Sequence, residues 1–200
     1  MKRFLHVGCG ADSQSQTPFA SELAAWRETR MDLDPAVRPH ILGSITDMSA
    51  VANEDFDAVY SSHNIEHIYF TEVPQALKEF RRVLKPSGFA LVTCPDLQSV
   101  CALIAEGHLT HTAYLSPAGP IAPMDIVFGF RPDIAAGKLH MAHKCGFTQA
   151  TLTEVLQDAG FGSIATIRRP DPYFDLWALA LANNQSEQYL RTEAAKYFPT

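Results

Sequence analysis

The sequence has few cysteines, fewer basic than acidic residues and no long apolar run, and each shortage excludes a class of protein. Its 4 cysteines are scattered over 200 residues without a Cys-x-x-Cys pair, so we expect reduced thiols rather than a disulfide framework. No apolar run approaches the ~20 residues of a membrane span. The short stretch between Lys2-Arg3 and Gly8 cannot hold the apolar core of a signal peptide. We therefore expect a cytoplasmic protein without a membrane partner.

The deficit of basic charge also limits the partners. There are 16 lysines and arginines against 22 acidic residues, which gives a formal net charge of -6. Because no basic cluster appears, we expect no nucleic-acid partner. A hydrophobic content of 46% with 19% charged residues is typical of a soluble globular chain, and this length suits one domain with its own core.

The most informative stretch is Phe4–Gly10, where apolar residues run directly into the turn Gly8-Cys9-Gly10. Glycine accepts positive φ and lets the backbone approach a ligand closely, so this turn predicts a cofactor cradle at the end of a strand. Ser13 stands where a dinucleotide fingerprint needs its third glycine, and no Gly-Lys-Ser/Thr phosphate loop is present. Asp12 would repel a pyrophosphate and favours a cofactor with an amine and a positive sulfur.

A second feature is Asp32, near the end of the next predicted strand, Arg30–Pro35. The spacing from Gly8 is that of one βαβ unit, which brings the carboxylate beside the glycine turn, where it can accept both hydroxyls of a ribose. The alternative is that Asp32 and Asp34 are ordinary turn residues before Pro35.

The apolar periodicity predicts alternating strands and helices through most of the chain. We expect strands at 4–7, 40–43, 56–60 and 89–93 besides the one that ends over 30–35, and helices at 17–29, 71–84 and 148–159. Two last strands, 164–168 and 173–181, are joined by too few residues for a crossover helix and must be antiparallel. From Asn183 the tail is either one amphipathic helix or partly disordered.

These features resemble the class I S-adenosylmethionine-dependent methyltransferases, in particular the small-molecule branch often called the type 11 methyltransferase domain. The resemblance rests on the glycine turn, Asp32, Phe56–Tyr60 with Ser62-His63, the run Glu79–Phe89 and Ala159-Gly160-Phe161. It implies an α/β fold, a doubly wound, mostly parallel seven-stranded sheet with a C-terminal antiparallel hairpin. One domain would then span 1–182 and the tail 183–200.

The resemblance also implies S-adenosyl-L-methionine as cofactor and assigns residues to it. Gly8 and Gly10 would lie under its methionine part and Asp32 would bind its ribose. The loop Ser44, Ile45 to Asp47 would face the adenine, and Ser62 and His63 would border the methionine carboxylate and the methyl group. The family usually has an acidic residue at the place of His6. Either His6 accepts from the cofactor's ammonium, or that contact passes to Asp12.

The acceptor is predicted to be a small molecule or a sugar, methylated on a hydroxyl. The end of the fourth strand lacks the Asn/Asp-Pro-Pro-aromatic signature of the enzymes that methylate nucleobase and glutamine amino groups. A hydroxyl must lose its proton, and histidine titrates near neutral pH, so His63 and His67 are the candidate bases. Alternatively, His67 is structural and His63 contacts only the cofactor. We expect substrate contacts from Asn64, Asp96, Tyr114, His140 and His143, although Asp96 also suits a helix N-cap.

The run His140–Cys145 offers two imidazoles and one thiolate, which are three metal ligands without an evident fourth. We therefore predict no metal site and place His143 on the substrate side.

Prolines and glycines exclude a long regular element from Gly107–Gly146. This segment is predicted to form a lid that encloses the acceptor. The alternative is a surface excursion that packs on the core or on a second subunit. The chain itself would be a monomer or a homodimer. Two other functions stay open, a catalytically inactive S-adenosylmethionine-binding module and a nucleotide-dependent dehydrogenase.

Overall fold

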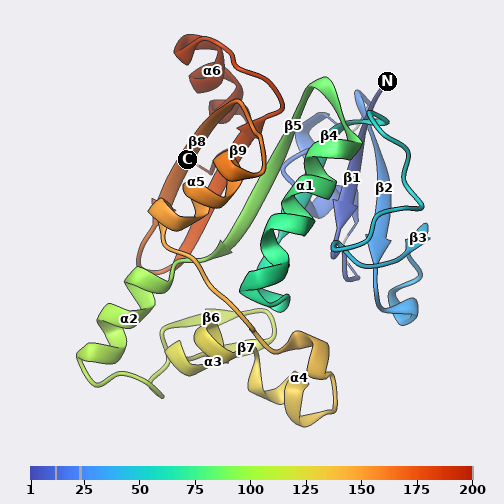
Figure 1. Ribbon diagram of the computed structural model, residues 1–200. Coiled ribbons are helices and arrows are strands. Elements are labelled where there is room, and N and C mark those ends of the chain that lie inside the picture. The colour runs from blue at the N-terminus through green and yellow to red at the C-terminus, as the bar shows by residue number, and fades with distance from the viewer. Residues whose placement is uncertain (12, 23, 200) are drawn as a thin grey trace.

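A computed structural model describes residues 1–11, 13–22 and 24–199 and has at its centre a seven-stranded sheet of order β3-β2-β1-β4-β5-β9-β8 (Figure 1). The first five strands of this order are parallel, and β9 is antiparallel to both β5 and β8. The predicted α/β fold and its antiparallel hairpin are therefore confirmed. The strands are β1 Lys2–Val7, β2 Trp26–Asp32, β3 Ile41–Leu42, β4 Phe56–Ser62, β5 Leu84–Pro95, β8 Ser163–Arg169 and β9 Asp175–Leu181.

One face of the sheet is covered by α1 (Val73–Val83) and α5 (Gln149–Asp158) (Figure 1). In α1 the apolar side chains recur at helical spacing, Pro74 falls in the first turn, and Arg81 and Arg82 follow in the last turn, where cations suit the helix dipole. The prediction of this helix is confirmed, but the chain passes from Val83 directly into β5, so that strand begins five residues before the predicted Phe89.

The opposite face differs from the prediction. A crossover helix over 17–29 is wrong, because the described residues between β1 and β2 form only two 3₁₀ turns, Gln14–Gln16 and Ala20–Glu22, and Trp26 already begins β2. Pro18 removes a backbone donor. The Thr17 hydroxyl donates to the Gln14 carbonyl (2.8 Å) and so competes with helical bonding. In place of a helix, the Phe19 side chain packs on this face of the sheet, with its ring centroid 4.3 Å from that of Phe4.

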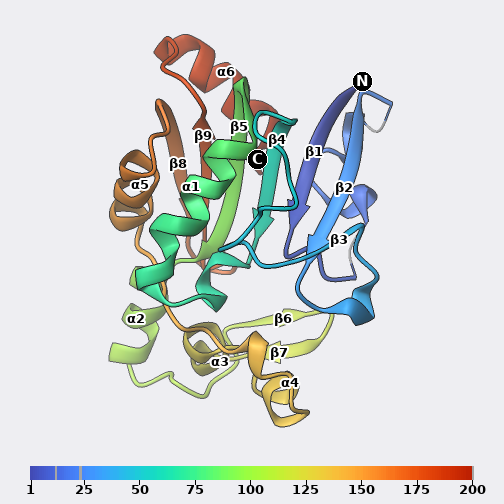
Figure 2. The same ribbon diagram turned by 45° about the vertical axis from the view of Figure 1, so that its right-hand side comes forward.

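The tail completes this second face. Helix α6 (Glu187–Tyr197) begins at the N-cap Ser186, whose hydroxyl accepts from the Tyr189 N–H (3.2 Å). Tyr197 is buried against Phe19 and Phe89, with ring centroids 5.2 and 4.9 Å away. Figure 2 shows α6 near the end of the sheet away from β6 and β7. Of the two expectations for the tail, a helix or partial disorder, the helix is confirmed.

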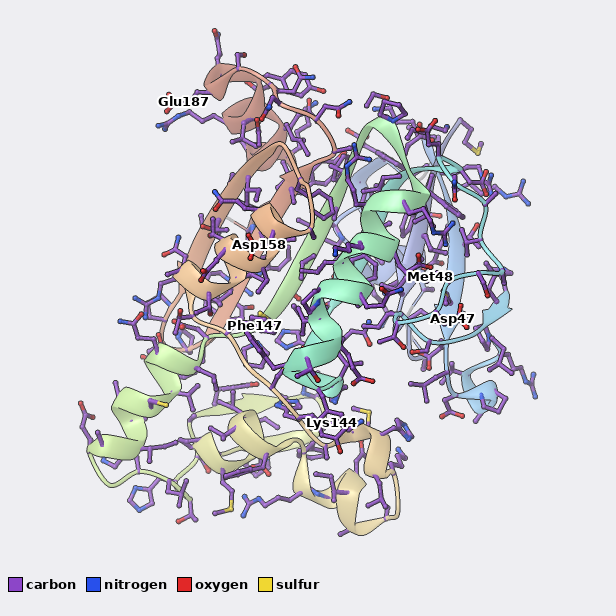
Figure 3. All side chains as sticks on the ribbon, viewed as in Figure 1. Asp47, Met48, Lys144, Phe147, Asp158 and Glu187 are labelled. Atoms are coloured by element: carbon purple, nitrogen blue, oxygen red, sulfur yellow. The ribbon has the colours of Figure 1, made fainter. Side chains whose placement is uncertain are left out.

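The segment 107–146 gathers at the carboxyl ends of the parallel strands (Figure 2). Its longest regular element has 6 residues, as its prolines and glycines predicted. Helix α2 (Leu97–Ala105) precedes the segment. The segment itself holds β6 Tyr114–Ser116, β7 Gly119–Ile121, α3 Pro123–Phe128 and α4 Arg131–Ala135. The chain then returns to α5 past the start of α1, with Lys144 and Phe147 along it (Figure 3). Among the described residues, no helix is both long and apolar enough to cross a membrane.

Candidate functional site

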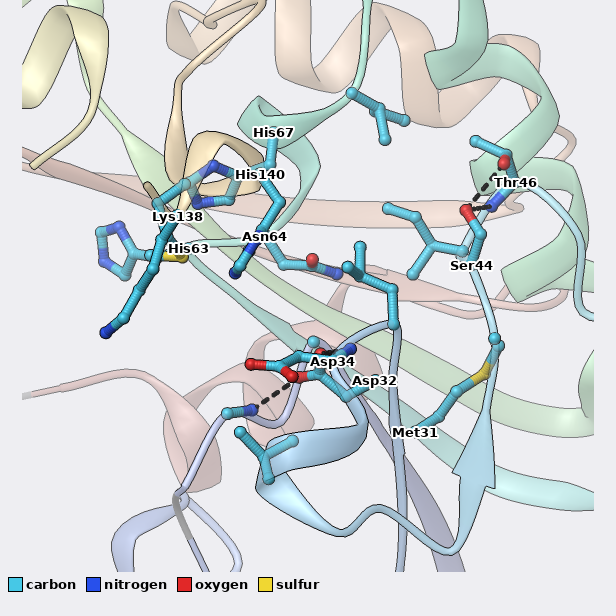
Figure 4. Close-up of a pocket in the computed structure, with 18 of the residues that line it drawn as sticks. Met31, Asp32, Asp34, Ser44, Thr46, His63, Asn64, His67, Lys138 and His140 are labelled. Atoms are coloured by element: carbon cyan, nitrogen blue, oxygen red, sulfur yellow. Dashed lines mark hydrogen bonds between the residues drawn. The ribbon is translucent and has the colours of Figure 1, made fainter. Parts of the chain in front are cut away.

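Two adjoining cavities open where the parallel strands end, the usual ligand position in open α/β sheets. The larger measures about 510 Å³ and the smaller about 180 Å³. His63, His67 and Met141 line both, so the two cavities meet at these side chains. Figure 4 shows the larger cavity with Asp32 and Asp34 on one side and His63, His67 and His140 on another.

The glycine turn forms one wall of the larger cavity. Gly8 and Gly10 have φ of 60° and 53°, a region that favours glycine. A Cβ on Gly8 would lie 2.3 Å from the Asn64 Cγ, whereas a Cβ on Gly10 would meet nothing within 4 Å. The backbone is therefore open toward the cavity at Gly10 and closed by Asn64 at Gly8. Burial raises the pKa of Cys9, between them, to about 11, so its thiol stays neutral.

Asp32 lies beside this turn as its spacing predicted. Its Oδ2 accepts from the Gly10 N–H (2.8 Å) and its Oδ1 from the Asp34 N–H (2.9 Å). These two bonds fix the carboxylate at the cavity wall. A carboxylate has about four acceptor positions, so each oxygen can still accept from a ligand hydroxyl.

The loop after β3 lines a third side. Ser44, Ile45 and Thr46 face the cavity, and the Ser44 and Thr46 hydroxyls lie 2.8 Å apart. The Asp47 side chain does not line it; its Oδ1 accepts from the Ser49 N–H (3.1 Å).

Three further predicted site residues are held away from both cavities. His6 is 2% exposed, and its Nδ1 lies 2.7 Å from Glu28 Oε1. Its place inside the second face therefore separates it from the cavity. Ser62 Oγ lies 3.0 Å from Thr93 Oγ1 and lines neither cavity. Asp96 is the N-cap of α2 and pairs with Arg168 (2.8 Å), so its alternative interpretation is correct. The remaining candidate, Asp12, lies outside the described residues.

The segment 107–146 contributes to both cavities. Tyr114 and His143 line the smaller one and His140 lines the larger one, as substrate contacts would. The rest of the smaller cavity is mostly apolar, with Ile121, Ile126, Phe130 and Phe174 in its wall. His143 Nδ1 lies 2.8 Å from the Ile126 carbonyl oxygen, and His67 Nδ1 lies 3.3 Å from that of Ala142.

Glu66 is the site residue that the sequence did not reveal. It lies in the 3₁₀ turn Ile65–His67 after β4, is 1% exposed, and lines the smaller cavity. His63 Nδ1 lies 3.5 Å from its Oε1, and His67 and His143 are beside it. Burial alone would raise the pKa of this carboxyl, but the histidines, His63 first, hold the pKa below its usual range. The spacing His63-x-x-Glu66-His67 was its only sequence signal.

Comparison with known proteins agrees with this geometry. Residues 5–92 match the family model described as "Methyltransferase domain". A Pyrococcus horikoshii protein of solved structure is similar, with 17% identity, 90% of this chain and 81% of that chain covered, and a TM-score of 0.62. A methyltransferase from Methanosarcina mazei is also similar, with 13% identity, 92% of this chain and 93% of that chain covered, and a TM-score of 0.59. A methyltransferase from Archaeoglobus fulgidus has 14% identity, with 90% of this chain and 86% of that chain covered and a TM-score of 0.58. No curated protein matches the sequence.

The likeness to solved structures establishes the fold, and the family match places a methyltransferase domain on residues 5–92. Together with the glycine turn and Asp32, they support a methyltransferase domain of the class I fold. The family match supports an S-adenosylmethionine-dependent methyltransferase and implies S-adenosyl-L-methionine as its cofactor. This result replaces the dehydrogenase alternative.

Proposed function

We propose that this enzyme methylates a hydroxyl of a small-molecule acceptor, which binds in the smaller cavity while S-adenosylmethionine binds in the larger one. The observation that carries the proposal is that the two cavities meet at His63 and His67. A methyl donor in one and an acceptor in the other would therefore face each other there. Most of the acceleration in such an in-line displacement can come from positioning the two reactants.

The larger cavity fits the cofactor by its chemistry. Asp32 offers free acceptor positions for the ribose hydroxyls, and the open backbone at Gly10 admits close approach. Ser44 and Ile45 would flank the adenine, the one with a polar and the other with an apolar surface. His63 and Asn64 would border the methionine part. Bound there, S-adenosylmethionine supplies a methyl group on a positively charged sulfur.

The smaller cavity limits the acceptor. Its volume of about 180 Å³ equals that of roughly six water molecules, and its wall is mostly apolar. Its polar residues are Tyr114, Tyr173, Glu66, Asp125 and the three histidines, and the Asp125 carboxylate is already paired with Arg131 (2.6 Å). This combination suits a compact acceptor with an apolar body and one polar group to be methylated. His67 or His63 would accept the hydroxyl proton, directly or through a water.

The segment 107–146 would serve as the lid over this acceptor. It supplies Tyr114, Phe130, Met141 and His143 to the wall of the smaller cavity, and Lys138 to that of the larger one. Enclosing the reacting groups excludes water from the sulfonium and strengthens the electrostatic interactions around it. Specificity for the acceptor would then be set by this segment rather than by the sheet.

The acceptor hydroxyl is tested with matched compounds. We expect isotope-labelled methyl from S-adenosylmethionine to appear as a methyl ether on small aromatic or cyclic alcohols. The amines that differ only at the reacting atom should stay unlabelled. Mass spectrometry of the products measures the transfer. Label on the amines alone would contradict the hydroxyl proposal and leave the methyltransferase activity intact.

The cofactor assignment gives a second prediction. Asp32→Ala removes a charged acceptor from the ribose, and a hydrogen bond to a charged group contributes about 1.5–3 kcal/mol. We therefore expect the Kd for S-adenosylmethionine to rise at least tenfold, measured by calorimetry. Asp47→Ala, which removes a carboxylate from the same end of the sheet but outside the cavity, should leave the Kd unchanged. Equal affinity in wild type and Asp32→Ala would refute the ribose contact.

A further inference from the structure

Glu66, His67 and His143 bring one ligand atom each to within 4.8 Å of one another. They come from two segments far apart in the sequence, the turn after β4 and the chain that returns to α5. The N–H groups of Lys144 and Cys145 donate to the Glu66 carbonyl (2.8 and 3.2 Å) and hold the two segments together. Ligands of a tetrahedral ion at 2.0–2.2 Å lie about 3.4 Å apart, so small side-chain movements would complete such a site.

The Glu66 carboxylate is the strongest sign of a missing partner. It is 1% exposed, and among the described residues neither oxygen has a hydrogen-bond donor. A buried carboxylate without such bonds is costly, because its hydration has been lost without replacement. Its nearest cationic candidate, His63 Nδ1, is 3.5 Å from Oε1. The nearby histidines lower the pKa of this carboxyl through their charge, but a bound cation would give its oxygens the direct partner that they lack.

Both histidines are oriented as metal ligands usually are. His143 Nδ1 is 2.8 Å from the Ile126 carbonyl oxygen, and His67 Nδ1 is 3.3 Å from that of Ala142. When Nδ1–H donates to a carbonyl, the proton is fixed on that nitrogen and Nε2 carries the free lone pair. This is the tautomer that coordinates a metal, and the carbonyl contact holds the ring in place. The two rings lie close together, with centroids 4.8 Å apart.

We propose that Glu66, His67 and His143 bind one divalent transition-metal ion, with Zn²⁺ as the best match, next to the acceptor. Two imidazoles and one carboxylate with an open fourth position are a catalytic zinc set. All three residues line the smaller cavity, so the open position faces the space assigned to the acceptor. This site differs from the one considered in the sequence, where His140, His143 and Cys145 were three possible ligands without a fourth. Of those three residues, only His143 is a ligand here. Cys145 donates to the Ile65 carbonyl instead, at 3.3 Å.

The role of the ion rests on the proposed function. With His67 bound to the ion, His63 is the remaining candidate base. A hydroxyl oxygen bound at the open position would be polarised, and its proton would pass to His63, directly or through a water. The oxygen then forms a bond to the methyl carbon while the carbon–sulfur bond breaks. The products are the methyl ether and S-adenosylhomocysteine. The metal therefore makes the oxygen a better nucleophile and fixes it in line with the methyl group.

The test begins with the full chain, stripped of metal by a chelator and titrated with Zn²⁺ against a chromophoric competitor. We expect one equivalent to bind. Glu66→Gln and His143→Ala, which remove one ligand each, should weaken binding by at least 100-fold. His111→Ala, an exposed histidine of the same segment, should leave it unchanged. Equal zinc affinity in wild type and both ligand variants would overturn the site.

Two readouts keep the test independent of folding and of activity. Co²⁺ added to wild type should give the intense visible bands of a four-coordinate ion, and their absence would overturn the proposal. Zn²⁺ should also raise the Tm of wild type and of His111→Ala but not of Glu66→Gln. A protein that binds no metal yet still transfers methyl to the alcohols refutes the metal site alone. One that binds metal but methylates only amines refutes the hydroxyl acceptor instead.

Discussion

Replacing Gly8 with alanine is expected to abolish measurable binding of S-adenosylmethionine. At φ 60° a Cβ costs about 1–2 kcal/mol in strain. Here it would also lie 2.3 Å from the Asn64 Cγ, far inside van der Waals contact. Asn64 would have to leave its place after β4, where it lines the larger cavity, which we propose for the cofactor. We expect the Kd measured by calorimetry to rise more than 100-fold and the Tm to fall.

Two other glycines separate the causes of this effect. Gly107→Ala has the strain of a positive φ, 89°, but no neighbour within 4 Å and no place in either cavity. It should lower the Tm modestly and leave cofactor binding intact. Gly10→Ala also meets no protein atom within 4 Å, but its Cβ would occupy the cradle. It should weaken binding with less loss of Tm than Gly8→Ala. Wild-type affinity in Gly8→Ala would contradict the proposed position of the cofactor.

The sheet was predictable because its signals are local. A short apolar run before Gly8 marks a buried parallel strand, and the short link between the last two strands requires an antiparallel pair. Helix α1 carries its own start, apolar face and stop. The failed helix at 17–29 is a case where side-chain competition and Pro18 outweighed a scatter of helix-forming residues.

The larger cavity, proposed for the cofactor, was predictable from the sequence, and the smaller cavity, proposed for the acceptor, was not. Asp32 follows from the repeat length of a βαβ unit, which is a property of the chain. Glu66 and His143 meet only because the segment 107–146 returns past the start of α1, and no periodicity encodes that return. His6 was misplaced for a related reason. Alternation along β1 sends its side chain to the second face, where Glu28 pairs with it.

The second large effect is expected from Phe19→Ala, which should destabilise the fold by about 3–5 kcal/mol. Phe19 is 1% exposed and takes the place of the crossover helix that the described residues before β2 do not form. Its ring contacts five others, with centroid distances of 4.3 Å to Phe4, 4.8 Å to Trp26, 5.2 Å to Tyr197, 6.1 Å to Tyr60 and 6.2 Å to Phe89. Truncation therefore leaves a cavity between the sheet and α6.

Urea unfolding measures this effect, and two variants control for it. Phe19→Leu keeps most of the volume and should cost less than about 1.5 kcal/mol. Phe128→Ala removes the same side chain from a position that is 57% exposed, so its effect should be much smaller. Below its lowered Tm, Phe19→Ala should still bind S-adenosylmethionine normally, because Phe19 lines neither cavity. A loss below 1 kcal/mol would show that α6 and β2 hold this face together without the ring. The Phe19 ring would then contribute little to the stability of this face.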